Sequence, residues 1–230
     1  ELNAEMIAAP FAVLGMLALL RGLGSGRRLP FVGAGAAFAL GALAKPVYLM
    51  DALSAGIAVL SWALGSRSAT QAARPVCTVT RVARGLGVVL ALLGGAALTL
   101  TPWLLYFISH GALRDAWGVY VASNLTYARY IPLREALRDA VEYLEGPVVA
   151  LSALWGLGLA GAWMLLATGE RPRHERLLGA VWLALTVFGV LVGRRFFYHY
   201  LVQPIVPAAV LAGGPLALMA RGSRNGANEA

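Results

Sequence analysis

Seven apolar segments divide this chain of 230 residues, and they restrict its fold more than any other feature. The segments cover residues 4–20, 30–44, 47–64, 85–106, 146–168, 177–193 and 201–220. An α-helix needs about 20 apolar residues to cross the roughly 30 Å hydrocarbon core of a bilayer. Helices also satisfy their own backbone hydrogen bonds where water is absent. We therefore expect an all-α, polytopic membrane protein with about seven transmembrane helices, arranged as one transmembrane domain over residues 1–230.

Composition agrees with this expectation. Charged residues make up 13% of the chain, whereas a soluble domain typically carries about 25%. The single cysteine, Cys77, excludes an internal disulfide and a metal site built from several cysteines. The chain begins at Glu1 without an initiator methionine, and the first apolar segment fits a signal peptide poorly because no basic region or cleavage site precedes it. We expect a fragment of a longer membrane protein that has further spans ahead of this chain.

The basic residues are distributed unevenly between the two sides of the membrane. If the segments cross alternately, one side receives twelve arginines and three acidic residues, and the other receives seven basic and eight acidic residues. The twelve are Arg21, Arg27, Arg28, Arg67, Arg74, Arg81, Arg84, Arg171, Arg173, Arg176, Arg221 and Arg224. Cytoplasmic loops are enriched in arginine and lysine. We therefore expect an external amino terminus and a cytoplasmic carboxyl terminus, and the net charge of +8 needs no nucleic-acid partner.

Lys45, the only lysine, stands with Pro46 between the second and third segments. The second segment has roughly 14 apolar residues, or about 21 Å of helix, so the turn at Lys45 is expected below the outer membrane plane. Asp51 follows about a turn and a half later. Lys45 either pairs with Asp51 or Glu5 and holds helices together, or faces a water-filled cleft and binds an anionic substrate.

A second polar group lies on the outer side, between the sixth and seventh segments. Arg194 and Arg195 oppose the overall charge distribution, and phosphate is an apt partner because guanidinium binds it with two hydrogen bonds. His199 and Tyr200 follow closely. The aromatic residues here also suit a membrane interface, without any further role.

Residues 107–145 form the longest outer segment, and they are too many for a simple turn. Leu113, Trp117 and Val121 recur at helical spacing, and Asn124 continues their stripe. A second apolar face follows, formed by Leu133, Leu137, Val141 and Leu144. We expect amphipathic helices that lie in the membrane interface.

One motif in the fifth segment is misleading. Residues 156–161 match the dinucleotide-binding pattern GxGxxG. That pattern requires a preceding strand and a helix amino terminus at the phosphates, and neither is expected inside a span. The small residues predict close helix packing instead.

Four short motifs carry a family resemblance. They are Asn3-Ala4-Glu5, Gly41-Ala42-Leu43-Ala44-Lys45-Pro46, Asn124-Leu125-Thr126-Tyr127-Ala128 and His199-Tyr200-Leu201, the last followed by Pro204 and Pro207. In this order, all on the outer side, they resemble bacterial glycosyltransferases of the protein-mannosyltransferase and aminoarabinose-transferase type. The resemblance covers most of the chain.

The resemblance implies transfer of a sugar from a polyprenyl-phosphate carrier to a glycan, lipid or protein acceptor, at the outer face of the bacterial cytoplasmic membrane. It places the catalytic carboxylate in an outer loop ahead of this chain, so the fragment alone is expected to be inactive. We assign Lys45, Arg194 and Arg195 to the phosphate. Glu5, Asn124, Tyr127, His199 and Tyr200 are assigned to the cavity lining or the sugar. No cofactor is assigned, and a divalent metal is left open.

Two alternatives from other functional classes remain at this stage. Short helices interrupted by proline also mark transport sites, so a transporter or lipid-handling module without catalysis is the principal alternative. A membrane subunit with a purely structural role is the other.

Overall fold

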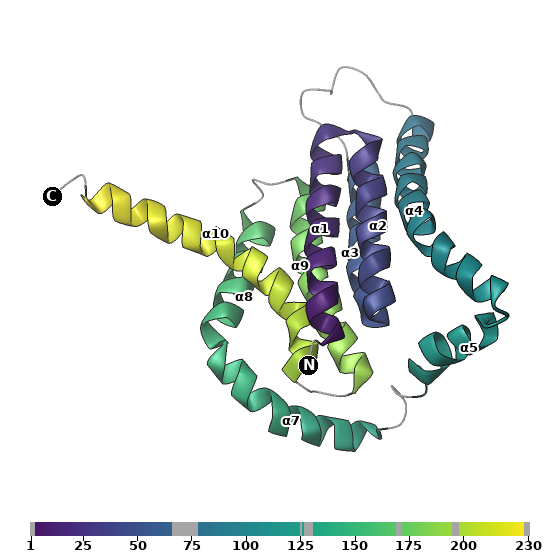
Figure 1. Ribbon diagram of the computed structural model, residues 1–230. Coiled ribbons are helices and arrows are strands. Elements are labelled where there is room, and N and C mark those ends of the chain that lie inside the picture. The colour runs from purple at the N-terminus through teal and green to yellow at the C-terminus, as the bar shows by residue number, and fades with distance from the viewer. Residues whose placement is uncertain are drawn as a thin grey trace.

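The computed structural model describes residues 3–65, 78–124, 126, 131–168, 172–194 and 198–227. Every regular element in these ranges is helical, as Figure 1 shows. The helices are α1 (Ala4–Ser25), α2 (Arg28–Ala44), α3 (Leu49–Gly65), α4 (Thr78–Ser109), α5 (Leu113–Trp117), α7 (Leu133–Ala150), α8 (Ser152–Ala167), α9 (Arg173–Gly193) and α10 (Val202–Ala227). Three single turns join them, namely η1 (Pro46–Tyr48), η3 (Gly118–Ala122) and η4 (Tyr198–Leu201). The expected all-α fold is confirmed.

Each of the seven apolar segments corresponds to a helix. Among the described residues, five helical stretches are long and apolar enough to cross a bilayer, and α2 and α8 are shorter apolar helices of 17 and 16 residues. The five are Ala4–Ser25, Pro46–Leu64, Val82–Ser109, Arg173–Val192 and His199–Met219. The chain is therefore a multi-pass helical membrane protein.

The fifth segment differs from the expectation of one continuous span over 146–168. The helix breaks at Leu151, whose backbone leaves the helical region at φ −107° and ψ 17°. Residues 146–150 form the end of the amphipathic helix α7, and α8 alone continues the apolar part. The chain changes direction at this break, and α7 lies across the end of the bundle (Figure 1).

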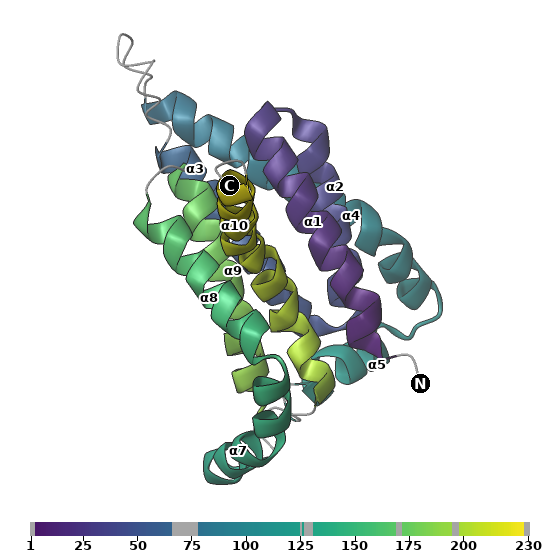
Figure 2. The same ribbon diagram turned by 90° about the vertical axis from the view of Figure 1, so that its left-hand side faces the viewer.

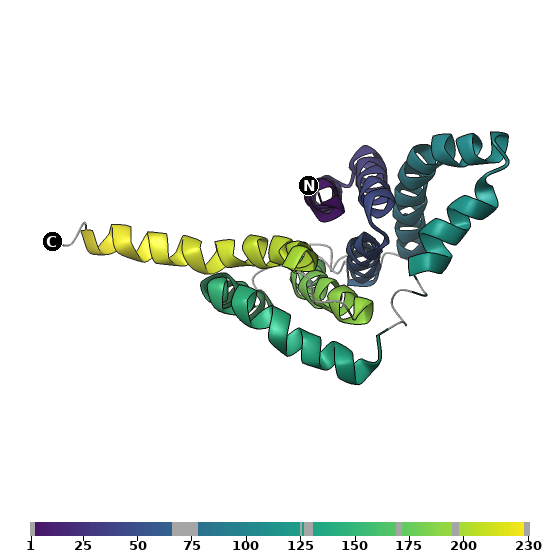
Figure 3. The ribbon, with the colours of Figure 1, turned by 60° about the horizontal axis from the view of Figure 1, so that its bottom comes forward.

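The two ends of the bundle differ in charge. The turn from α1 to α2, the end of α3 and the starts of α4 and α9 lie at one end, which we call the arginine-bearing end (Figure 1, top). Its described arginines include Arg21, Arg27, Arg28, Arg84 and Arg173. The amino terminus, α5 and α7 lie at the opposite end (Figures 1 and 2). Toward its carboxyl end, α10 runs away from the other helices (Figure 3).

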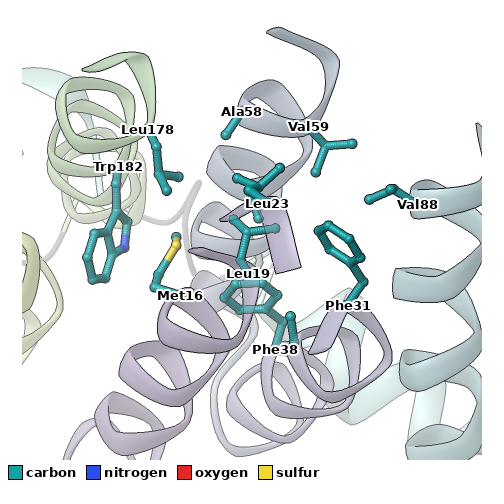
Figure 4. Packing of buried hydrophobic residues seen from close by; sticks show 12 residues of the cluster. Met16, Leu19, Leu23, Phe31, Phe38, Ala58, Val59, Val88, Leu178 and Trp182 are labelled. Atoms are coloured by element: carbon teal, nitrogen blue, oxygen red, sulfur yellow. The ribbon is translucent and has the colours of Figure 1, made fainter. Parts of the chain in front are cut away.

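Apolar side chains from five helices form the main core. Met16, Leu19 and Leu23 of α1 face Phe31 and Phe38 of α2. Val59, Val88, Leu178 and Trp182 from α3, α4 and α9 complete it (Figure 4). Many other leucines stay exposed on the outer faces of the helices, as a lipid environment allows.

Glycines bring α2 and α4 into close backbone contact. A Cβ atom on Gly95 of α4 would collide with the carbonyl oxygen of Val32, and one on Gly35 of α2 would collide with that of Leu92. Gly158 and Gly161 face the backbones of Ala208 and Leu211 in the same manner, so the GxGxxG match serves helix packing, as expected.

We expect Gly95→Ala to destabilise the protein by about 1–3 kcal/mol, because the backbones of α2 and α4 would have to separate. Gly94→Ala is the matched control, since a Cβ on Gly94 meets nothing within 4 Å. Gly94→Ala should leave the free energy of unfolding unchanged or raise it by up to about 1 kcal/mol, because alanine has a better helix propensity than glycine. Unfolding in mixed detergent micelles measures the free energy of unfolding of both variants. Equal changes for Gly95→Ala and Gly94→Ala would contradict the close contact between α2 and α4.

Candidate functional site

A buried ion pair joins the start of α1 to the turn after α2. The side chain of Glu5, in the first turn of α1, is only 2% exposed, and its Oε1 atom pairs with Nζ of Lys45. Lys45 has an extended backbone because a residue before proline avoids the helical region, and α2 therefore ends at Ala44. Pro46 then starts η1, where its missing N–H costs little. The local sequence thus presents Lys45 toward α1.

The turn η4 brings two aromatic residues to this ion pair. His199 Nε2 lies 3.8 Å from Glu5 Oε1, and the His199 side chain is 33% exposed. Lys45 Nζ lies 3.7 Å from the centroid of the Tyr200 ring, which is the geometry of a cation–π contact. The rings of His199 and Tyr200 are 4.6 Å apart. Residues far apart in the sequence therefore share one polar cluster.

Tyr48 completes what we call the Glu5 cluster: Glu5, Lys45, Tyr48, His199 and Tyr200. The Tyr48 hydroxyl donates a hydrogen bond of 3.1 Å to the backbone oxygen of Glu5, and its buried ring packs on Ala8 and Ala12. Sequence reasoning missed Tyr48, although its position two residues after Pro46 places it beside Lys45. Its hydrogen bond fixes the start of α1 against η1.

A second buried polar group, the Asp51 cluster, comprises Asp51, Trp182 and Gln203. Asp51 is 1% exposed and accepts a hydrogen bond of 2.5 Å from the indole Nε1 of Trp182. Gln203 Nε2 donates to the backbone oxygen of Val47 at 3.1 Å and to Asp51 Oδ2 at 3.4 Å. Within the described residues, the buried Oε1 atom of Gln203 has no hydrogen-bond donor. Lys45 pairs with Glu5, so Asp51 is held by neutral donors from α9 and α10.

Arg194 is close to the Glu5 cluster in sequence but is bound elsewhere. It ends α9 in the left-handed conformation, at φ 50°, and its guanidinium donates to the backbone oxygen of Ile131 at 3.1 Å. This bond fixes the start of α7, whose Ala136 packs near Val190 and Tyr200. In the part of the chain that the structure describes, no hydrogen bond or ion pair joins Arg194 to Glu5.

Asn124 is exposed, and its amide donates to the backbone oxygen of Tyr120 at 2.8 Å. No hydrogen bond in the described ranges connects Asn124 with the Glu5 cluster. Tyr127, Arg195 and Cys77 lie outside the described residues. The binding roles assigned to Asn124, Tyr127, Arg194 and Arg195 therefore stay predictions.

An apolar groove of about 1150 Å³ lies between the end of α4 and the α5–η3 segment. Trp103 and Phe107 form one wall, and Leu113 and Val121 form the other. Leu43, two residues before Lys45, also lines the groove. The groove is thus apolar along its length and lies near the same turn that presents Lys45.

Within the described residues, no group of three or more histidine, cysteine or acidic side chains could hold a metal ion. No protein-family model, curated protein or solved structure matches this chain. The chemistry of the two clusters is therefore the basis for inferring function.

Removal of the indole donor by Trp182→Phe should destabilise the protein by about 1–3 kcal/mol, because the buried Asp51 carboxyl would lose its hydrogen bond. In an Asp51→Leu background, Trp182→Phe should lower the free energy of unfolding by less, since no carboxyl group remains there to accept the indole's hydrogen bond. Trp163→Phe is the matched control, because Trp163 is 72% exposed and should tolerate the change. Unfolding in mixed micelles measures all of these variants. An equal cost of Trp182→Phe in both backgrounds would contradict the hydrogen bond's contribution.

Proposed function

We propose that this chain is part of a polyprenyl-phosphate-dependent glycosyltransferase and that the Glu5 cluster binds the phosphate of the lipid carrier. The observation that carries the proposal is the convergence of three of the four sequence motifs in this one cluster. Glu5, Lys45 and His199 come from separate motifs, and both Lys45 and His199 lie within ion-pair range of Glu5 Oε1. The resemblance rests on the motif residues, their order and their common place on the outer side, and the contacts around Glu5 add that three of the motifs meet at one point.

The cluster has the charge and access that a lipid phosphate requires. Lys45 is 19% exposed at its side chain and His199 is 33% exposed, so the cluster is partly open although Glu5 is buried. His199, when protonated, adds a second cation at the same point. Such charges act strongly because little water surrounds them. A phosphate would thus compete with Glu5 for Lys45 and His199.

The surroundings suit the remainder of such a carrier. The apolar groove beside Leu43 can take a hydrocarbon tail, and α7 covers the neighbouring side through Tyr200. In the transfer, a bond forms from the acceptor oxygen to the anomeric carbon as the bond from that carbon to the phosphate oxygen breaks. The acceptor's proton passes to a base, and cations beside the departing phosphate stabilise its charge.

The proposal includes an orientation in the bacterial cytoplasmic membrane. The arginine-bearing end faces the cytoplasm by the positive-inside rule, with the carboxyl terminus on that side. The Glu5 cluster, the amino terminus of this chain and α7 then lie at the outer face. A carrier whose phosphate sits at the outer headgroup level would meet Lys45 from that side.

Transport without catalysis is the second candidate, and the Asp51 cluster favours it. A carboxyl group held inside a bundle of spans is a common feature of ion and substrate pathways. Against it, Lys45 and His199, the partly exposed residues of the Glu5 cluster, lie at one end of the bundle and not midway along it. Chemical conversion of the donor distinguishes the two candidates.

A photoreactive polyprenyl phosphate should label the full-length protein, because this probe carries the phosphate and tail common to every donor. Lys45→Met should reduce labelling about tenfold or more, since one charge-assisted contact to phosphate is lost. The Glu5→Gln/Lys45→Met double variant should stay equally weak, although it no longer holds an unpaired buried charge. Arg21→Gln, at the opposite end, is the control and should label like the wild type.

Restored labelling in the double variant would show that Lys45 only holds helices together, and it would refute phosphate binding. Polyprenyl-phosphate mannose and polyprenyl-phosphate aminoarabinose then test catalysis, with release of polyprenyl phosphate as the readout. Release from either donor supports the transferase. Labelling together with movement of intact carrier across the vesicle membrane would instead establish the transporter.

A further inference from the structure

A hollow of about 570 Å³ lies between α2, α3 and α4 at the arginine-bearing end, far from the Glu5 cluster along each helix. Arg28 opens α2, and Arg84 lies in the second turn of α4. Both line the hollow, and so does Trp62 of α3. Phe31 and Val88, which are buried, form an apolar floor. The lining thus combines two guanidinium groups with an apolar and aromatic surface.

Both arginines are directed toward the same space. An Nη2 atom of Arg28 lies 3.7 Å from the point where a Cβ on Gly87 would be, so Arg28 reaches across to α4. The guanidinium carbon of Arg84 lies 6.0 Å from the centroid of the Trp62 ring. Neither arginine forms an ion pair with a carboxylate of the described residues. Two positive charges therefore share one hollow without a protein anion to balance them.

The position of the hollow identifies the anion that would balance these charges. Arg84 lies at the start of the apolar stretch Val82–Ser109 and is exposed, and an arginine near the end of a span reaches the headgroup level. Arg28 lies at a helix amino terminus, whose backbone dipole adds positive potential. Leu29 and Leu86, close to the two arginines in sequence, are exposed. An anion at this level of the bilayer is a lipid phosphate, and basic pockets between spans recognise such headgroups.

We propose that Arg28 and Arg84 form a binding site for the phosphate of an anionic phospholipid, with Trp62 and Phe31 contacting the start of its acyl chains. Arginine binds phosphate through paired hydrogen bonds, so two arginines from different helices can hold one headgroup from both sides. The lipid would bridge α2 and α4 at the arginine-bearing end. This site is independent of the sugar carrier and of the Glu5 cluster.

The test uses the purified full chain in nanodiscs that contain phosphatidylglycerol and phosphatidylcholine, with retained lipid measured by native mass spectrometry. The wild type should retain phosphatidylglycerol preferentially. Arg28→Gln and Arg84→Gln should each lower its retention about tenfold, and the double variant should show no preference. Arg21→Gln, an exposed arginine at the same end that does not line the hollow, is the matched control and should retain the preference.

A second variant keeps both charges. Gly87→Leu would fill the hollow beside Arg28, and it should also reduce retention without changing the net charge. Undiminished preference in the double arginine variant, or in Gly87→Leu, would overturn the proposal. If millimolar inorganic phosphate displaced the retained phosphatidylglycerol, the proposal would also be overturned, because the site would then bind a free anion and not a lipid.

Discussion

The ion pair between Glu5 and Lys45 is the interaction on which the end of the bundle opposite the arginines depends. A carboxylate that is 2% exposed inside a membrane protein is costly unless a cation meets it, and removal of one partner of such a pair typically costs about 3–5 kcal/mol. Lys45 meets Glu5 because Pro46 ends α2 and turns the chain toward α1. Tyr48 and η4 then pack around the pair.

The Glu5 and Asp51 clusters each join helices that are far apart in the sequence. The Glu5 cluster connects α1 and the α2–η1 turn to η4, and the Asp51 cluster connects α3 to α9 and α10. One cluster is charged and partly open, whereas the other is closed and held by neutral donors. The partly open, charged cluster is suited to binding an anion, and the closed cluster is suited to holding α3, α9 and α10 together. The same helices leave a hollow lined by arginines at their other ends.

The helices and part of the site could be predicted from the sequence, because both depend on local patterns. Apolar length predicted seven apolar helices, of which five among the described residues are long enough to cross a bilayer. Lys45-Pro46 predicted the turn, and Glu5 was one of the two partners expected for Lys45. The break at Leu151 could not be found, since an uninterrupted apolar run gives no signal where an interfacial helix becomes a spanning one. The bond from Trp182 to Asp51 crosses 131 residues, and hydropathy treats tryptophan as apolar. Arg194 was assigned to phosphate from its charge, whereas its contact with Ile131 depends on the path of α7.

The most direct test of the central claim is a double-mutant cycle on Glu5→Gln and Lys45→Met, with the free energy of unfolding measured in mixed detergent micelles. If the pair holds the start of α1 to the η1 turn, each single variant should lose about 3–5 kcal/mol. The double variant should then lose clearly less than the sum of the two single losses, because neither charge is left alone. Losses that add within about 0.5 kcal/mol would show that the two residues do not interact, and they would contradict this account.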